Sequence, residues 1–258
     1  MGRVMSAAPL ATAEIIAVGT ELLGSTRVDT NSLFLSDRVA SLGIDLRAKS
    51  VVGDDRGRLA ALFTAAVART DLVILTGGLG PTDDDLTREV VAGALGLELD
   101  EDPAVVASLE QRFARRGLQM PPVNRRQAMV PRGATVLENP NGTAPGLLIE
   151  IGEIGGELGG RVVVLLPGPP RELQPMMEAL CAGRLAARAG ISRAHKVSLF
   201  IAGKGESHVE EIVQPIYSRW TAADPPIETT ILSAPGDGSA RVEASVIPLS
   251  CPYLVVTG

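Results

Sequence analysis

Short apolar runs alternate with amphipathic stretches over the first part of the chain. The apolar runs are typical of strands and occupy 14–19, 44–52 and 71–76. The stretches that follow them have apolar residues at helical spacing and occupy 31–42, a segment opening near 54–55, and 84–95. Three strand-then-helix units in succession predict a parallel sheet with right-handed crossovers, and therefore an α/β fold.

The elements that follow are expected to extend or flank this sheet. Helices are predicted over 103–116 and 124–129, and a hairpin is predicted from strands at 147–151 and 161–166. A further helix is expected from Pro169 and Pro170 through Leu180, because proline suits the first helical turn.

After Gly190 the pattern no longer alternates strand and helix. It predicts a strand, a helix and two more strands, at 195–201, 206–220, 227–232 and 240–247. We therefore predict a flexible tail over 1–12, a main domain over 13–175 and a small α+β module over 176–258. This module is poor in catalytic residue types, so a packing or dimerisation role is expected for it.

Composition agrees with a globular α/β protein. Hydrophobic residues make up 45% of the chain and aromatics only 3%, which suits an aliphatic core of helices packed on a sheet. The formal net charge of -6 argues against bulk attraction to nucleic acid or an anionic membrane. No signal sequence or bilayer-length apolar run is present, and the cysteines, Cys181 and Cys251, are far apart. We expect a cytoplasmic protein.

Loops rich in glycine and acidic residues follow the predicted strands. In an open parallel sheet, ligands bind beyond the carboxyl ends of the strands. The loops at those ends are 19–24, 29–31, 53–55, 77–85 and 167–172. Gly77, Gly78 and Gly80 are candidates to bring backbone N–H groups close to phosphate oxygens, although tight turns use the same residue.

Acidic residues crowd the same strand ends. Asp83, Asp84 and Asp85 follow the glycines, and Asp54 and Asp55 follow the neighbouring strand. Helix capping and the helix dipole offer one explanation of such acids. The alternative is a divalent cation, which would relieve their repulsion from one another and from an anionic ligand.

Other polar residues in these loops are candidates for nucleotide contacts or for caps. They are Asn124, Gln127, Asn139, Asn141, Thr143 and Arg171. Glu172 is a candidate to bind a metal ion or a water molecule. His195 and His208 lie away from the loops, so histidine catalysis is disfavoured.

Taken together, these motifs resemble the N-terminal domain of the CinA family over roughly residues 14–180. The matching segments are Gly19-Thr-Glu-Leu-Leu23, Asp29-Thr-Asn31, Val52-Gly-Asp-Asp55, Thr76-Gly-Gly-Leu-Gly-Pro-Thr82 with Asp84, Asp85 and Thr87, then 124–128, 139–146 and 167–172. A weaker match at 203–207 looks like the start of the KH-type module that follows in this family. The usual small apolar residue after Gly168 is replaced here by Pro169.

The resemblance implies a three-layer α/β/α fold shared with molybdopterin-binding proteins, a homodimer, and an ADP-ribose pyrophosphatase dependent on magnesium or cobalt. It implies catalytic roles for Asp54, Asp85 and Glu172, and a metal site formed by Asp54, Asp84 and Asp85. The nucleotide- and phosphate-binding residues would be Gly19, Thr20, Glu21, Asn31, Gly77, Gly78, Gly80, Thr82, Asn124, Asn141, Gly142, Thr143, Gly168 and Arg171.

The leading hypothesis is hydrolysis of ADP-ribose, or a related nucleotide sugar, to AMP and a sugar phosphate. The alternative is a molybdopterin-binding or adenylyl-transfer protein that uses the same pocket. Full-length relatives often carry a nicotinamide mononucleotide deamidase domain, for which a chain ending at Gly258 has no room, so no deamidation is expected. A nucleic-acid-binding module is disfavoured, because 203–205 is not a Gly-x-x-Gly loop with basic flanks.

Overall fold

The computed structural model describes residues 8–152, 158–189, 195–201, 203–220, 227–233 and 240–246. The chain divides into two compact units, and the later division falls after Arg188. Of the predicted tail, residues 1–7 lie outside the described part. Leu10 is buried and its N–H donates to the Arg188 carbonyl oxygen at 2.8 Å. The end of the predicted tail is therefore packed against the first unit.

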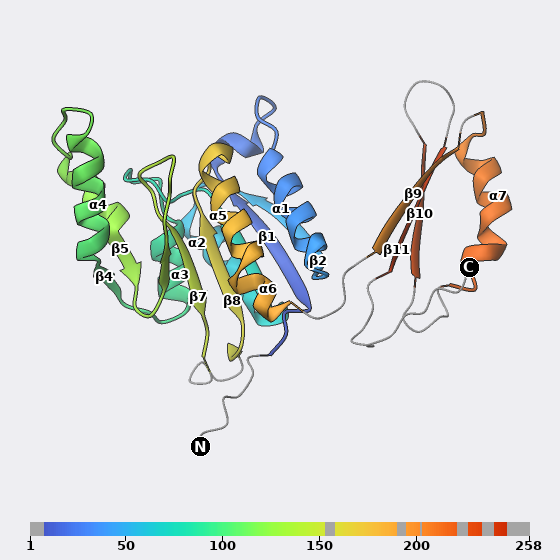
Figure 1. The fold of residues 1–258 in the computed structure, drawn as a ribbon, viewed down its shortest axis with the longest axis horizontal. Helices are drawn as coiled ribbons and strands as arrows, with labels where there is room; N and C mark the ends of the chain where they lie inside the picture. The colour runs from blue at the N-terminus through green and yellow to red at the C-terminus, as the bar shows by residue number, and fades with distance from the viewer. Residues whose placement is uncertain are drawn as a thin grey trace, which may run out of the picture. The chain divides into compact units, whose positions relative to one another are not determined.

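A six-stranded sheet forms the centre of the first unit (Figure 1). Its strands are β1 (Thr12–Val18), β2 (Asp45–Val52), β3 (Leu72–Thr76), β6 (Thr135–Leu137), β7 (Gly146–Glu150) and β8 (Val162–Leu166). Their order is β2-β1-β3-β8-β7-β6. The first four run parallel, whereas β7 and β6 are antiparallel to their neighbours. The predicted mostly parallel sheet is therefore confirmed, and it is mixed.

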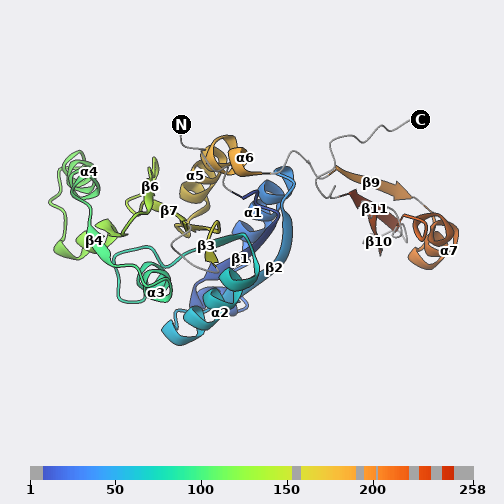
Figure 2. The same ribbon diagram turned by 90° about the horizontal axis from the view of Figure 1, so that it is seen from below.

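Helices cover both faces of this sheet (Figure 2). Helices α1 (Thr30–Ser41), α5 (Pro170–Ala182) and α6 (Arg184–Arg188) lie on one face, and α2 (Arg56–Arg69) and α3 (Thr87–Ala94) lie on the other. Strand β3 is buried throughout. Its Val73 and Leu75 belong to the cluster that contains Phe63 of α2, and the alternation of a strand directs Leu72 and Ile74 to the opposite face.

The sequence patterns missed the shortest elements of the first unit. Strands β4 (Leu99–Glu101) and β5 (Met129–Pro131) pair as a small antiparallel ribbon beside α4 (Pro103–Ala114). Together with β6 they have three residues each, too few for a recognisable alternation. The predicted helix over 124–129 is a 3₁₀ helix, η2 (Pro122–Ala128), and a second 3₁₀ helix, η1 (Thr20–Leu23), follows β1.

Helix α3 begins later than the pattern indicated. The expected start was Asp84, but the helix opens at Thr87. The backbone N–H of Asp85 donates to the Thr82 carbonyl oxygen, and the Asp85 side chain accepts from the Thr82 N–H. These local bonds hold residues 82–85 in a turn, which postpones the helix.

The second unit is a three-stranded antiparallel sheet with one helix. Strands β9 (His195–Ile201), β10 (Ile227–Ser233) and β11 (Ala240–Val246) lie in the order β10-β11-β9, with α7 (Glu206–Tyr217) connecting β9 to β10 in sequence. Buried Val209 of α7 packs with Val242 of β11. This confirms the α+β pattern, while the KH-type assignment stays a prediction. Among the described residues, no helix combines the length and apolarity needed to cross a bilayer.

Truncating the core residue Phe63 tests this packing. Phe63 is fully buried between α2 and the sheet. We expect Phe63→Ala to lower the free energy of unfolding by about 3–5 kcal/mol, measured by urea denaturation. The exposed neighbour Thr64 provides the control, and Thr64→Ala should change stability by less than about 0.5 kcal/mol. Equal losses in the two variants would contradict the placement of α2.

Candidate functional site

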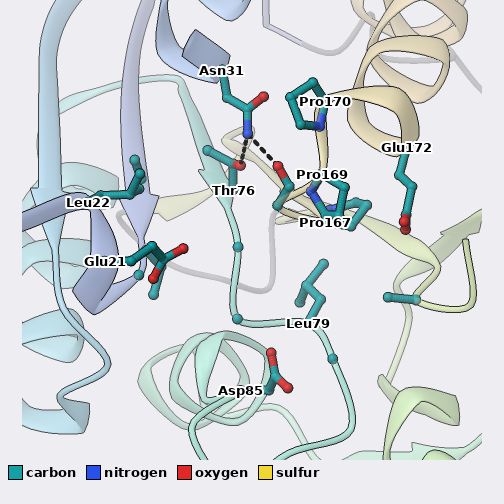
Figure 3. A pocket seen from close by; sticks show the side chains of 18 of the residues that line it. Glu21, Leu22, Asn31, Thr76, Leu79, Asp85, Pro167, Pro169, Pro170 and Glu172 are labelled. Carbon is teal, nitrogen blue, oxygen red and sulfur yellow. Dashed lines mark hydrogen bonds between the residues drawn. The ribbon is translucent and has the colours of Figure 1, made fainter. Parts of the chain in front are cut away.

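A pocket of about 660 Å³ lies at the carboxyl ends of the parallel strands (Figure 3). Adjacent strands β1 and β3 are followed by connections that leave in opposite directions along the sheet, toward β2 after β1 and toward the side of β8 after β3. Such a switch point opens a crevice between loops, and it is where open α/β sheets bind ligands. The size is in the range of small-molecule sites.

The pocket brings together most of the residues that the sequence nominated. Its lining includes Gly19, Glu21, Asn31, Asp54, Gly77, Gly78, Gly80, Asp84, Asp85, Thr143, Gly168 and Glu172. The nominated residues outside the lining are Thr20, Thr82, Asn124, Asn141, Gly142 and Arg171. Residues far apart in sequence therefore meet at one place because their strands share an edge.

Two threonines outside the lining hold acidic side chains that are in it. The Thr20 N–H donates to Asp54 Oδ2 at 2.9 Å, and the Thr20 hydroxyl oxygen accepts from the Asp54 N–H at 3.0 Å. Thr82 donates from both its N–H and its hydroxyl to Asp85 Oδ2, at 2.9 and 2.6 Å. Hydrogen bonding from Thr82 and from its own backbone N–H lowers the pKa of the nearby Asp84.

The glycine-rich loop after β3 has its carbonyl groups held from one side. The Thr87 hydroxyl donates to the Gly77 carbonyl oxygen at 2.8 Å, and the Thr87 N–H donates to that of Gly78 at 3.1 Å. Arg88 Nη2 donates to the Leu79 carbonyl oxygen at 2.8 Å. All three donors belong to the first turn of α3.

Fixing those carbonyls also fixes the N–H groups of the following residues. In a planar trans peptide the N–H points opposite to the carbonyl of the same unit. The N–H groups of Gly78, Leu79 and Gly80 therefore point away from the donors in α3, and no acceptor among the described residues takes them. The Gly77 N–H, in contrast, donates to the Leu166 carbonyl oxygen at 3.0 Å. The loop thus offers three neighbouring N–H groups.

Packing within the protein accounts for the glycines themselves. Gly77 has a φ of 96°, and a Cβ there would lie 2.1 Å from the Val18 carbonyl oxygen. At Gly78, with a φ of 64°, a Cβ would lie 2.3 Å from the Thr87 hydroxyl oxygen. Tight turns and available N–H groups, two explanations considered separately for the sequence, therefore occur in the same loop.

Asn31 joins the ends of two central strands. Its Nδ2 donates to the Thr76 hydroxyl oxygen at 3.2 Å and to the Gly168 carbonyl oxygen at 2.7 Å (Figure 3). Asp29 Oδ1 accepts from the Ser32 N–H near the start of α1, which orients the helix that carries Asn31. Asn31 therefore fixes the spacing between the loops after β3 and β8.

Glu172 is a carboxylate buried at the edge of the pocket. It is 8% exposed, and its Oε2 accepts from Asn139 Nδ2 at 2.8 Å. Asn139 Oδ1 accepts from the N–H groups of Asn141 and Gly142, so this loop closes around the carboxylate. A Cβ at Gly142 would lie 1.8 Å from Glu172 Oε2.

Three of the nominated residues, Asn141, Arg171 and Asn124, do not line the pocket. Asn141 Nδ2 donates to the Arg171 carbonyl oxygen at 2.6 Å, which ties the 139–142 loop to α5, while the Arg171 side chain is exposed. Asn124 is buried and donates to Gln127 Oε1 at 3.0 Å. It is Gln127 that lines the pocket.

The lining is strongly acidic. It contains Glu21, Asp29, Asp54, Asp84, Asp85 and Glu172, and within the described residues Arg27 is its one basic side chain. The carboxylates of Glu21, Asp85 and Glu172 lie on three sides of the pocket (Figure 3). An anionic ligand therefore needs positive compensation here.

The carboxylates do not form a complete metal cage. In the described part of the chain, no three His, Cys, Asp or Glu side chains are grouped closely enough to hold an ion. Magnesium, however, is commonly bound by one or two carboxylates together with ligand phosphates and water. One or two of the carboxylates of Asp54, Asp84 and Asp85, which all line the pocket, would suit that second arrangement, in which the ligand completes the site.

Sequence reasoning missed some lining residues, among them Arg27, Val28, Thr76 and Leu79. Thr76 ends a buried strand and Leu79 is a buried apolar residue, so both resemble core positions in the sequence. Arg27 and Val28 lie in the segment between η1 and α1, where no periodic pattern marks them. Only the meeting of the loops shows that these residues face the same space.

An α/β domain with a ligand pocket at its switch point is a small-molecule-binding fold. Residues 14–187 match the family model described as "Probable molybdopterin binding domain". A "CinA-like protein" of Koribacter versatilis is 46% identical over 232 residues, covering 90% of this chain and 54% of the relative. The chain belongs to the CinA-like members of the molybdopterin-binding domain family.

Two further relatives agree with this assignment. A "Putative competence-damage inducible protein" of Symbiobacterium thermophilum is 49% identical over 217 residues, covering 83% of this chain and 49% of the relative. The crystal structure of the protein CinA, of unknown function, from Thermoplasma acidophilum is 34% identical with a TM-score of 0.59, covering 66% of this chain and 96% of that one. The chain spans about half the length of the curated relatives it matches.

Gly77→Ala tests whether the loop needs glycine for space as well as for its backbone conformation. Gly96 is the matched control, because its φ is 67° but a Cβ there would meet nothing within 4 Å. We expect Gly96→Ala to destabilise by about 1–2 kcal/mol, the cost of the left-handed backbone. Gly77→Ala should cost clearly more, since the Val18 carbonyl must move. Thermal unfolding of both variants measures this, and equal costs would rule out the close approach.

Proposed function

We propose that this pocket binds a nucleotide sugar and hydrolyses its phosphoanhydride, with ADP-ribose as the first candidate. Water attacks one phosphorus, the bridging P–O bond breaks, and the products are AMP and ribose 5-phosphate. The observation that supports this proposal most is the loop after β3, which offers three N–H groups without an acceptor among the described residues and lines the same pocket as Asp84 and Asp85. Such N–H groups bind phosphate oxygens, and the carboxylates suit a cation shared with those oxygens.

In this proposal Asp54, Asp84 and Asp85 would hold a divalent cation only together with the ligand, because among the described residues no three such side chains are grouped closely enough to hold an ion alone. When bound, magnesium or cobalt would polarise the phosphoanhydride and offset the negative charge of the lining. The protein's own contribution is to keep these carboxylates in place, since Thr20 fixes Asp54 and Thr82 fixes Asp85.

In this proposal Glu172 accepts the proton of the attacking water. Its Oε2 is engaged by Asn139, and its Oε1 lies 3.9 Å from the exposed Arg171 Nε. A carboxylate that lines the pocket and has one oxygen held suits a general base, whose orientation must be fixed before proton transfer. Burial of Glu172 also limits competing contact with bulk water.

The family's description supports a second candidate. A molybdopterin carries a phosphate, and the same three N–H groups would suit it. Isothermal titration with ADP-ribose, AMP and molybdopterin separates the two functions. Binding of molybdopterin without hydrolysis of any nucleotide sugar would favour the second candidate.

Asp85→Asn tests the acidic half of the proposal. The amide oxygen can still accept from Thr82, so the loop is expected to keep its shape while losing the charge that a cation needs. We expect no measurable ADP-ribose hydrolysis with magnesium or cobalt and an unchanged unfolding curve. Asp83→Asn is the matched control, since Asp83 precedes the pair and lies fully exposed outside the lining. Wild-type turnover in Asp85→Asn would remove the mechanism.

Glu172→Gln tests the proposed base. Glutamine keeps the size and an acceptor for Asn139 but has no basic carboxylate. We expect kcat to fall by about 10²–10⁴-fold with little change in KM, because the group acts on the water rather than on the nucleotide. Glu178→Gln makes the same chemical change on the same helix at an exposed position and should leave kcat unchanged. A change in KM alone would assign Glu172 to binding instead.

A further inference from the structure

Arg88 is a fully buried cation at the first turn of α3. It is 1% exposed and the largest fully buried side chain described. Its Nη2 donates to the Leu79 carbonyl oxygen, whereas Nε and Nη1 are buried without any hydrogen-bond partner in the described structure. No carboxylate within the described residues forms a salt bridge with it. Its charge is therefore not neutralised by direct contact.

This arrangement is costly for the fold alone. Burying a charge and leaving N–H groups unpaired both oppose folding. Desolvation by burial lowers the pKa of Arg88, although the charges of Glu89 and Asp85 oppose this effect. Arginine still remains protonated in proteins. An apolar side chain of similar size would fill the same space with a smaller loss of folding free energy. Packing therefore does not explain why a guanidinium is buried here.

The position of Arg88 supplies that explanation. Its bond to the Leu79 carbonyl fixes the Leu79–Gly80 peptide, and with it the direction of the Gly80 N–H. Leu79 and Gly80 both line the pocket, while Arg88 does not. The guanidinium thus lies behind the loop, where burial keeps water from screening its field.

We propose that Arg88 is a positioning residue for anion binding: it aims the Gly80 N–H and places a buried positive charge behind the loop at residues 77–80. The inference rests on the proposed function only in assigning a phosphate-bearing ligand to this pocket. In a lining with six carboxylates and Arg27, a fixed buried cation offsets part of the repulsion of phosphate. It does so without occupying the space that the ligand takes.

The experiment compares Arg88→Met and Arg88→Lys with the wild-type chain. Methionine is unbranched and apolar and removes the charge, whereas lysine keeps it without the planar fork. Arg115→Met is the control for net charge, because Arg115 is exposed at the end of α4 and lines no described pocket. Isothermal titration with pyrophosphate, AMP and ADP-ribose in magnesium measures affinity. Urea denaturation without ligand measures stability.

We expect Arg88→Met to bind pyrophosphate about tenfold more weakly or worse, the loss typical of removing a charged hydrogen-bond donor. Its stability without ligand should be unchanged or raised, which a purely structural role would not allow. Arg88→Lys should recover part of the affinity, and Arg115→Met should bind like the wild type.

Wild-type affinity in Arg88→Met would overturn the inference. So would an unfolded or strongly destabilised Arg88→Met with wild-type binding by Arg88→Lys, because the residue would then act in folding alone. A wild-type chain that binds no pyrophosphate overturns it as well. If the wild type binds pyrophosphate but hydrolyses no ADP-ribose, the proposed function fails while the affinity ratio still decides the role of Arg88.

Discussion

The hydrogen bonds between the first turn of α3 and the loop after β3 fix the path of the backbone along one side of the pocket. Thr87 and Arg88 hold three successive carbonyl groups, and planar peptides then direct the next N–H groups the other way. The loop needs glycine at positions 77 and 78 to follow this path. In the proposed function, phosphate affinity is therefore a consequence of how the start of a helix is joined to the end of a strand.

Opposing charges shape the rest of the site. The lining is rich in carboxylates, each of which disfavours an anion, while the loop and the buried Arg88 favour one. The proposed cation, shared between carboxylates and phosphates, would reconcile the two, and such a site would be complete only with its ligand.

Support from outside the lining recurs in several places. Thr20, Thr82 and Asn139 lie outside the lining of the pocket, yet each of them donates a hydrogen bond that fixes a carboxylate in the lining. Asn31 does line the pocket, but its side-chain amide donates to the ends of two strands, at Thr76 and Gly168. Their polar side chains suggested nucleotide contacts in the sequence, because a residue that binds and one that orients a neighbour have the same chemical type.

The sequence by itself determined the order and type of the long elements, the parallel core and the loops that would carry the site. Hydrophobic periodicity specifies which face of a segment is buried, and glycine and aspartate mark the strand ends. Only the tertiary structure decided which loop residues face the pocket, that Arg27 and Thr76 join them, and that Arg88 is buried without a salt bridge among the described residues. Those properties depend on the packing of segments distant along the chain, which a local pattern does not encode.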